Sequence, residues 1–348
     1  MEALHLLHAP ITQEHTCFVS LMLSDPADVF RAFLGEPYPV LLDSAADGTG
    51  GGWGGGYSFL AADPFLILKS RGREAWVEIG NRRRPMGSDP FSALRHLLTA
   101  HAIPPVPDLP LLQGGAIGYL GYDLAQHLER LPSRSRDDLA LPEMCLAFYD
   151  WSLVHQRSSG RAWIVATGLP DRDQQAAAQR LEWVMAHLHG LETGEEPTVA
   201  PRASAADTLR SNFDREQYLA AVGRAKAYLT AGDIYQVNLS QRFQGPLREE
   251  PWQLYRRLRR VNPAPFAAYL GFPELTVVSA SPEEFLWVGG RQVRSRPIKG
   301  TRPRGLTPER DRELALSLME SVKDRAENLM IVDLVRSDLG RVCRIGSV

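Results

Sequence analysis

Helical spacing of apolar residues recurs in several segments of the chain and predicts amphipathic helices there. These segments are residues 174–188, the stretch between Asn212 and Gly232, the stretch opened by Pro251, and residues 308–320 and 322–336. On the helix opened by Pro251 we expect Tyr255 and Val261 to face inward. On the last helix we expect Ile331 and Leu334 to face inward, on the same side as Glu327.

Short apolar or alternating runs bounded by turn residues predict strands. They cover residues 57–60, 65–68, 75–79, 146–155, 162–167, 235–240, 266–270, 275–280, 285–288 and 292–296. The last two flank Gly289 and Gly290, which suit a hairpin turn because glycine accepts a positive φ. Since hairpins join most strands while helices come in groups, we predict an α+β fold, a large antiparallel-sheet sandwich with helices outside.

Glycine-rich stretches interrupt this pattern without matching a nucleotide-binding motif. Gly115, Gly118 and Gly121 are not surrounded by a parallel strand–helix–strand pattern, so they indicate close backbone packing. The tract 48–56 is almost all glycine and indicates a mobile loop. Residues 191–211 hold few large apolar side chains and predict a linker between an N-terminal region, 1–190, and a C-terminal region, 212–348.

Composition narrows the class of protein. The 39 Lys and Arg nearly balance the 41 Asp and Glu, so the net charge of −2 gives no footprint for nucleic acid. Cys17, Cys145 and Cys343 lack metal-site spacing, and we expect three free thiols. Because the sequence shows no signal peptide and no run of membrane-spanning length, we expect a cytoplasmic protein without membrane contact.

Lys299 is the most informative candidate residue. It lies in the segment 297–305, which reads PIKGTRPRG, beside Arg296, Arg302 and Arg304. A solvated basic edge strand is one explanation of such a cluster. A lysine nucleophile is the other, because nearby cations favour the free amine and attract an anionic substrate.

Three carboxylates add to this candidate chemistry. Glu283 and Glu284 follow a predicted strand, and one of them can act as a general acid or base unless both are surface groups. Glu327 shares the face of Ile331, and a buried carboxylate there needs a cation. Mg²⁺ is a suitable cation because it prefers oxygen ligands, and a salt bridge to Lys323 is the structural alternative.

Four motifs, taken in order, resemble the chorismate-utilising enzymes. They are 232–240 (GDIYQVNLS), 279–283 (SASPE), 297–305 (PIKGTRPRG) and 326–334 (AENLMIVDL), with weaker matches at 41–44, 62–65 and 114–122. This family includes anthranilate synthase component I, aminodeoxychorismate synthase component I, and the isochorismate and salicylate synthases. Lys299 stands where anthranilate synthases carry alanine, and Gln236 stands where the last two carry a water-activating lysine. The resemblance therefore favours the branch that makes 4-amino-4-deoxychorismate for p-aminobenzoate and folate synthesis.

The resemblance implies a mechanism and its participants. Lys299 would attack C2 of chorismate, and Glu283 would protonate the leaving C4 hydroxyl. Gly300 and Thr301 would contact the substrate, and Glu327 would bind Mg²⁺ that holds a substrate carboxylate. Ammonia would come from glutamine through a partner amidotransferase subunit.

The resemblance also implies a tryptophan pocket. Ser44, Tyr57, Pro265 and Phe266 match its positions. The match is partial, because anthranilate synthases carry glutamate at the position of Asp43 and usually serine at that of Ala264. A structural proline turn accounts for residues 262–266 equally well.

Motifs that follow in family members are absent before Val348, among them a second metal glutamate and a substrate arginine. We therefore expect an incomplete C-terminal region, a truncated chorismate site and an isolated chain that is inactive. Two alternatives stay open: anthranilate synthase component I, and a non-catalytic remnant that binds the amidotransferase or tryptophan.

Overall fold

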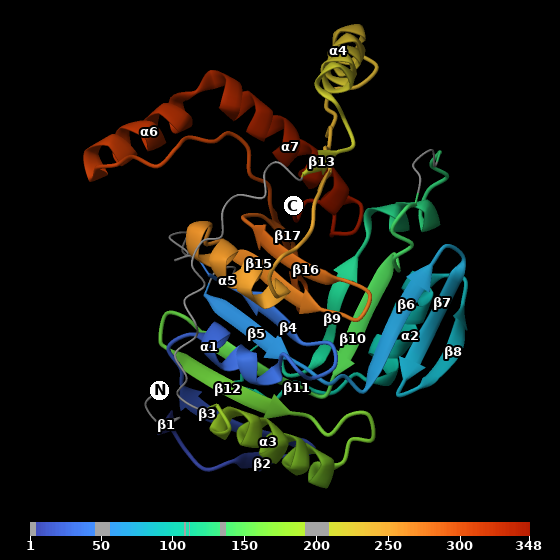
Figure 1. The fold of residues 1–348 in the computed structure, drawn as a ribbon, viewed down its shortest axis with the longest axis vertical. Helices are drawn as coiled ribbons and strands as arrows, with labels where there is room; N and C mark the ends of the chain where they lie inside the picture. Colours follow the sequence, from blue (N-terminus) through green and yellow to red (C-terminus); the bar gives the residue numbers. More distant parts are fainter. Residues whose placement is uncertain (1–4, 46–55, 108, 111, 133–136, 192–208) are drawn as a thin grey trace. The chain divides into compact units, whose positions relative to one another are not determined.

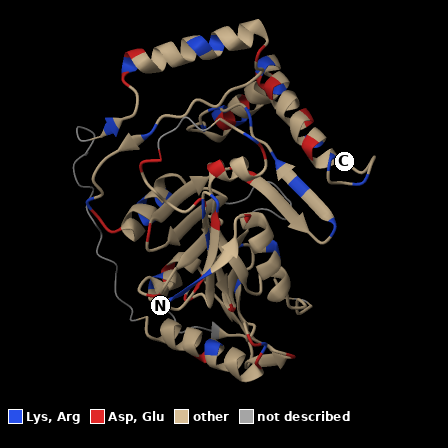
Figure 2. Cartoon of the chain, turned by 90° about the vertical axis from the view of Figure 1, so that its right-hand side faces the viewer, with Lys and Arg blue, Asp and Glu red and all other residues tan. Residues whose placement is uncertain are grey.

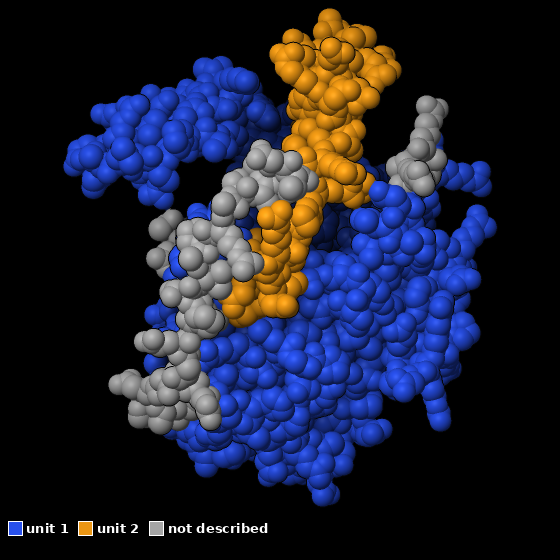
Figure 3. All heavy atoms as spheres, in the orientation of Figure 1, with its two compact units in different colours: residues 1–192, 255–348 blue, residues 193–254 orange. Residues whose placement is uncertain are grey.

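The computed structural model describes residues 5–45, 56–107, 109–110, 112–132, 137–191 and 209–348 (Figure 1). The chain forms two compact units, one made of residues 1–192 with 255–348 and the other of residues 193–254 (Figure 3). The expected glycine loop and the expected linker lie almost entirely outside the described residues. Both stay predictions, as does the division into 1–190 and 212–348.

A nine-stranded antiparallel sheet is the largest sheet of the larger unit. Its strands are β1 (His5–Leu6), β2 (Ile11–Gln13), β3 (Thr16–Met22), β4 (Val40–Asp43), β5 (Tyr57–Ala61), β11 (Trp151–Gln156), β12 (Arg161–Ala166), β15 (Phe266–Gly271) and β16 (Thr276–Ser281). They lie in the order β1-β3-β12-β11-β5-β4-β15-β16, with β2 paired to β3. Helix α3 (Gln174–His189) packs against β3 and β12. Its buried residues Ala177, Leu181 and Val184 form the apolar stripe that the sequence predicts.

A five-stranded antiparallel sheet lies in the same unit, in the order β8-β7-β6-β10-β9. Its strands are β6 (Leu66–Arg71), β7 (Glu74–Ile79), β8 (Arg82–Gly87), β9 (Gly115–Leu120) and β10 (Met144–Tyr149). Helix α2 (Pro90–Ala100) contacts β6, β7 and β8 through a face that buries Ala93 and Leu97. A Cβ added at Gly118 would lie 1.9 Å from the carbonyl oxygen of Cys145, which confirms close backbone packing at this glycine.

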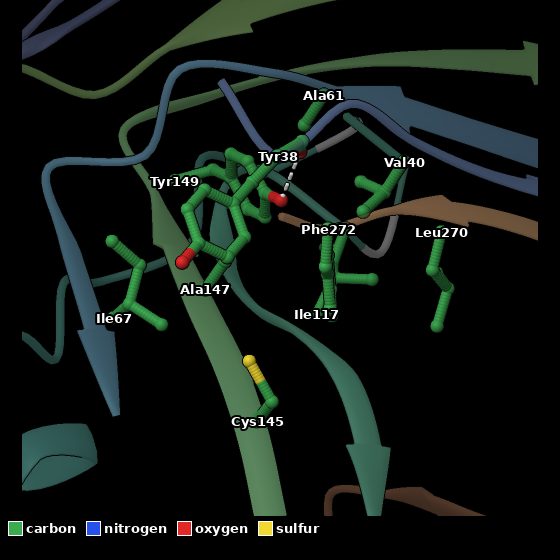
Figure 4. Close-up of a cluster of buried hydrophobic side chains, with 10 residues drawn as sticks. All are labelled: Tyr38, Val40, Ala61, Ile67, Ile117, Cys145, Ala147, Tyr149, Leu270 and Phe272. Atoms are coloured by element: carbon green, nitrogen blue, oxygen red, sulfur yellow. Dashed lines mark hydrogen bonds between the residues drawn. The ribbon is translucent and has the colours of Figure 1, made fainter. Parts of the chain in front are cut away.

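Side chains from both sheets share one apolar cluster, drawn in Figure 4. Tyr149 crosses it and donates its hydroxyl to the carbonyl oxygen of Tyr38 at 2.6 Å. Cys145 is fully buried there, and this burial raises the pKa of its thiol to about 12. Cys145 is therefore a structural thiol, and all three cysteines are free, as expected.

Lys69 joins the two sheets at the edge of this cluster. Its side chain is only 4% exposed, and its Nζ donates to Glu78 of β7 at 2.8 Å and to Glu274 between β15 and β16. Burial alone would lower the pKa of Lys69, but the hydrogen bonds that Lys69 donates to the two glutamates outweigh it and raise this pKa. The lysine therefore stays charged inside the protein and holds the β15–β16 turn to the five-stranded sheet.

The sequence predicts one strand over 146–155, and this prediction is wrong. The segment forms β10 and β11, which belong to different sheets, with Asp150 between them. The Asp150 carboxylate accepts from Nε of Arg180 at 2.9 Å, and its carbonyl oxygen accepts from the Thr167 N–H at 2.7 Å. Both flanking strands are apolar on both faces, so periodicity carries no sign of the change of sheet.

The remaining elements of the larger unit are short or lie near its C-terminal end. They are α1 (Pro26–Phe30), the 3₁₀ helices η1 (Arg31–Phe33) and η2 (Tyr122–His127), β17 (Glu284–Gly289), β18 (Gln292–Arg296), α6 (Pro308–Glu320) and α7 (Val322–Gly340). Helix α5 (Pro251–Val261) begins in the smaller unit and ends in the larger one. The predicted hairpin is confirmed, since β17 pairs with β18 and Gly290 has φ of 57°.

The expected inward residues of α5 and α7 are only partly correct. Tyr255 is fully buried, but Val261 is 79% exposed and Leu334 is 41% exposed. Glu327 is exposed as well, and no described residue of α7 is buried. Periodicity shows which residues share a face, but another element must cover that face before the residues are buried.

The smaller unit contains α4 (Arg215–Ala231) and the short pair β13 (Arg210–Ser211) and β14 (Phe243–Gln244). Asp214 caps α4 in a capping box with Gln217, and Gly232 ends it with φ of 80°. The predicted strand over 235–240 is wrong, since these residues have no regular secondary structure. A strand needs a neighbour for its backbone hydrogen bonds, and β13–β14 is the only strand pair described in this unit.

The sheets are antiparallel throughout the described residues, and α2 and α3 pack on them from outside. The expected α+β fold is thus confirmed. No helix in the described part of the chain is long and apolar enough to cross a membrane.

Candidate functional site

Lys299 lies in the loop that connects β18 to α6. It is half-buried, and within the described residues its ammonium group has neither a hydrogen bond nor an ion pair. The next residue, Gly300, has φ of 73°, a conformation that side chains disfavour. A Cβ on Gly300 would lie 2.9 Å from Leu318 and 3.0 Å from Asp324. The backbone beside Lys299 therefore requires glycine both for its φ angle and for space.

Glu283 contacts the same loop from the end of β16. Its Oε1 accepts a hydrogen bond from the Ile298 N–H at 3.3 Å. The side chain is exposed, and Oε2 has no partner among the described residues. Glu283 is thus bonded to Ile298, the residue that precedes Lys299. Its Oε2 is available to exchange a proton.

Glu284 differs sharply from its neighbour. Arg294 donates to both of its oxygens, from Nε at 3.0 Å and from Nη2 at 2.9 Å. These hydrogen bonds hold the pKa of Glu284 below its usual value. Because Glu284 is buried and paired within the β17–β18 hairpin, its role is structural.

The far side of the lysine loop is held by the first turn of α7. Arg302 donates from Nη2 to Oδ2 of Asp324 at 2.8 Å and from Nη1 to the Thr301 carbonyl oxygen at 2.9 Å. Ser321 caps α7, and its Oγ accepts from the Asp324 N–H at 3.3 Å. Hydrogen bonding to Ser321, followed by that to Arg302, lowers the pKa of Asp324. The loop therefore abuts a carboxylate that stays ionised.

Glu327 follows Asp324 by three residues on α7 and so shares its side of the helix. It is exposed, and neither Lys323 nor any other described residue pairs with it. The described residues contain no group of three or more His, Cys, Asp or Glu side chains placed to hold a metal ion. Glu327 thus offers one unpaired carboxylate, which suits a metal ion that draws its other ligands from substrate and water.

The arginines around Lys299 are compensated by carboxylates. Arg302 pairs with Asp324, Arg304 donates to both oxygens of Asp311 at 2.7 Å, and Arg296 lies 3.7 Å from Glu284. Both acidic and basic residues occur along the last two helices (Figure 2). The positive charges of the arginines beside Lys299 are therefore balanced by neighbouring carboxylates.

A separate cavity of about 320 Å³ lies between the nine-stranded sheet and β17. Its walls come from β4, β5, β15 and β17, and they include Tyr57, Pro265 and Phe266. Ser44 does not line it, since its hydroxyl accepts from the Gly56 N–H at 2.9 Å and its own N–H donates to Ser58 at 3.0 Å. The structure thus places three of the four expected pocket residues around one mostly apolar cavity.

Asp43, also in the cavity wall, is the centre of a buried network that the sequence did not suggest. Its Oδ1 accepts from Ser58 at 3.0 Å, and its Oδ2 accepts from the Tyr255 hydroxyl at 2.9 Å and from Nε of Arg259. Arg259 also donates to both oxygens of Asp25. Tyr255 and Arg259 are four residues apart on α5, and this spacing was the available signal.

Gln236, the residue that distinguishes branches of the family in the sequence analysis, belongs to the smaller unit. The lysine loop, Glu283, Glu327 and the cavity all belong to the larger unit. The larger unit therefore holds every residue expected to act on substrate or metal.

Comparisons with known proteins identify the family of the chain. Residues 54–348 match the family described as "chorismate binding enzyme", and the chain belongs to this family. It is 40% identical over 296 residues to aminodeoxychorismate synthase component 1 of Salmonella typhimurium, covering 84% of this chain and 61% of that protein. It is 42% identical over 268 residues to anthranilate synthase component 1 of Thermus thermophilus, covering 77% of this chain and 56% of that protein.

A solved structure has the same fold. Anthranilate synthase component I from Streptococcus pneumoniae superposes with a TM-score of 0.68 at 25% identity, covering 85% of this chain and 65% of that one. The chain spans about three-fifths of the length of the curated relatives it matches. The family is thereby established, while the particular reaction is a matter of proposal.

Proposed function

We propose that the chain belongs to the aminodeoxychorismate-forming branch, with Lys299 as nucleophile and chorismate as substrate. The observation that carries this proposal is the lysine itself, which follows Ile298 bonded to Glu283, precedes a glycine with positive φ, and has an amino group without a partner among the described residues. Chorismate is the ligand in the family description, and aminodeoxychorismate synthase component 1 is a relative's name. A close relative is an anthranilate synthase component 1, so that reaction is the second candidate.

In the proposed reaction, the neutral amine of Lys299 forms a bond to C2 of chorismate. The ring double bonds shift, and the C4 hydroxyl leaves as water with the proton that Oε2 of Glu283 donates. Ammonia then bonds to C4, the double bonds shift back, and the C2–nitrogen bond breaks to release Lys299 as the amine. The new C4 ammonium group returns a proton to the Glu283 carboxylate, which restores the acid. The net change replaces the C4 hydroxyl by an amino group, giving 4-amino-4-deoxychorismate and water.

Other groups hold the substrate in place in this proposal. Gly300 and Thr301 contact the substrate through the exposed side of the loop. Glu327 would hold Mg²⁺ through its carboxylate, and the ion would supply positive charge for binding a substrate carboxylate. Ammonia is delivered by a glutamine amidotransferase subunit, in line with the "component 1" in the relatives' names. The cavity lined by Tyr57, Pro265 and Phe266 is proposed as the tryptophan pocket, although Ser44 does not line it.

The test incubates the chain with chorismate and Mg²⁺, with and without ammonium, and follows both peptide masses and products. We expect the Lys299 peptide to gain the mass of chorismate less water, and this adduct to persist when ammonium is present. The Lys299→Ala variant should form no adduct, while Lys323→Ala, at an exposed position, should behave as wild type. The prediction that the isolated chain releases no product is contradicted if 4-amino-4-deoxychorismate accumulates.

Two results would overturn the assignment. Release of anthranilate, detected by its fluorescence and unaffected by Lys299→Ala, would favour the second candidate. Absence of both adduct and product would favour a non-catalytic chain that binds tryptophan or a partner subunit.

A further inference from the structure

The segment that contains Lys299 is fixed to its surroundings at several points, although Lys299 itself is unpaired. Ile298 donates its N–H to Glu283, and Gly300 packs on Leu318 and Asp324. Farther along, the Gly305 N–H donates to Oδ1 of Asp311 at 2.8 Å. The lysine is therefore a free side chain on a held backbone.

Arg302 ties this backbone to α7 through hydrogen bonds of its side chain. Its guanidinium spans two acceptors, the Asp324 carboxylate at 2.8 Å and the Thr301 carbonyl oxygen at 2.9 Å. A guanidinium can do this because its donors point in fixed directions, whereas an ammonium is a single point charge. Asp324 is itself oriented, since it lies in the first turn of α7 and its side chain is only 16% exposed.

The geometry points to Arg302 and Asp324 as a positioning pair for the Lys299 nucleophile, an inference that rests on the function proposed above. Arg302 fixes the Thr301 carbonyl, and Asp324 fills the space beside Gly300. Together they set the direction in which the chain presents Lys299 to the substrate. Neither residue contacts the reacting atoms, so the pair acts through the loop.

The pair also fixes the position of Glu327 relative to the lysine. Asp324 and Glu327 occupy successive turns on one side of α7. Because the loop is bound to Asp324, its position is also fixed relative to Glu327, the carboxylate proposed to hold the metal ion. Loss of the ion pair would release the loop from α7, the helix that carries Glu327, while Glu283 still holds Ile298.

The test compares two reactions of Lys299 in the whole chain. Adduct formation with chorismate depends on direction and should fall about 10- to 100-fold in Arg302→Gln and in Asp324→Asn. Carbamylation of Lys299 by cyanate needs only access and should change less than about 3-fold in the same variants. Arg302→Lys keeps the ion pair with Asp324 but loses the bond to Thr301, so its adduct rate should lie between those of wild type and Arg302→Gln.

Arg304→Gln is the matched control, because Arg304 also pairs with an aspartate but on α6. It should leave both rates unchanged. A purely structural role for Arg302 would lower adduct formation in step with the unfolding midpoint while carbamylation rises as Lys299 becomes more exposed, and this result would overturn the inference. Equal adduct rates in wild type and Asp324→Asn would do the same.

Hydrogen exchange separates failure of this inference from failure of the proposed function. In Asp324→Asn the amides of residues 298–301 should exchange faster than in wild type, whether or not chorismate reacts. If exchange is faster in Asp324→Asn but wild type forms no adduct, the pair fixes the loop and Lys299 is rejected as the nucleophile. Unchanged exchange would reject the pair while leaving Lys299 as the candidate nucleophile.

Discussion

Asp43 and Tyr255 stand 212 residues apart in sequence, yet the Tyr255 hydroxyl donates to Oδ2 of Asp43 at 2.9 Å in the interior of the larger unit. Burial, and then the adjacent carboxylate, raise the pKa of Tyr255, so it remains a donor across the accessible pH range. The bond ties α5 to the end of β4. It is the simplest place to measure what the buried network contributes.

Tyr255→Phe removes this donor and leaves the aromatic ring in place. We expect the free energy of unfolding to fall by about 1.5–3 kcal/mol, the range for a hydrogen bond to a charged group. Urea unfolding followed by fluorescence measures it. Tyr122→Phe serves as control, because Tyr122 is 94% exposed, and a loss of similar size there would refute the explanation.

Arg259→Met should cost more than Tyr255→Phe. The change leaves Asp43 and Asp25 without their shared cation, and unpairing buried charges costs about 3–5 kcal/mol. Arg260→Met, at the exposed neighbouring position, should change stability by less than about 0.5 kcal/mol. Thermal and urea unfolding of both variants give the comparison, and similar stability of the two would contradict the network's importance.

The Lys69 cluster should make stability depend on acid. Burial pushes the pKa of Glu78 upward, but hydrogen bonds from Lys69 and Trp76 outweigh it and bring the pKa below its usual 4.5. The stabilisation by Glu78 is therefore fully present above pH 4.5 and is lost as the pH falls through the folded-state value.

Unfolding of wild type and Glu78→Gln at pH 6, 4.5 and 3 tests this dependence. Wild type should be the more stable protein at pH 6, and the difference should shrink at pH 3. Glu74→Gln, at an exposed position on the same strand, controls for the change in net charge. A difference that stays constant over this range would show that the Glu78 carboxylate does not act as described.

Gly300→Ala tests the two reasons for a glycine beside Lys299, its positive φ angle and the lack of space for a side chain. Gly290 has a similarly positive φ of 57°, but a Cβ there would meet nothing within 4 Å. Gly290→Ala should therefore cost only the backbone strain, about 1–2 kcal/mol. Gly300→Ala adds the contacts with Leu318 and Asp324, so its unfolding midpoint should fall further. Equal losses in the two variants would mean that the loop moves away from α7 without cost.

Sequence periodicity predicts much of the fold wherever the local pattern of apolar residues is matched by a tertiary contact. The stripe on α3 predicts buried Leu181 and Val184 correctly because the nine-stranded sheet lies under that face. The prediction of close backbone packing at Gly118 is confirmed, because the missing side chain leaves room for the backbone of the neighbouring strand β10. In both cases the local pattern and the tertiary contact agree.

Other features depend on contacts that no local pattern contains. Asp150 marks a change of sheet, but the flanking apolar strands look continuous. The alternation over 235–240 describes a strand only when a partner strand is present. Of the candidate site, the sequence indicated Lys299, Glu283 and Glu327, while the compensation of the arginines depends on pairing across elements.

Strand β4 receives its two neighbours at very different times during synthesis. Leu41 pairs with Leu60 of β5 on one side and with Tyr269 of β15 on the other. A ribosome that has made β5 must still add most of the chain before β15 emerges, and until then one edge of β4 is open. Open edges invite pairing with other chains. The cavity that requires both Tyr57 and Phe266 is consequently a late product of translation, and a nascent chain must protect β4 until it forms.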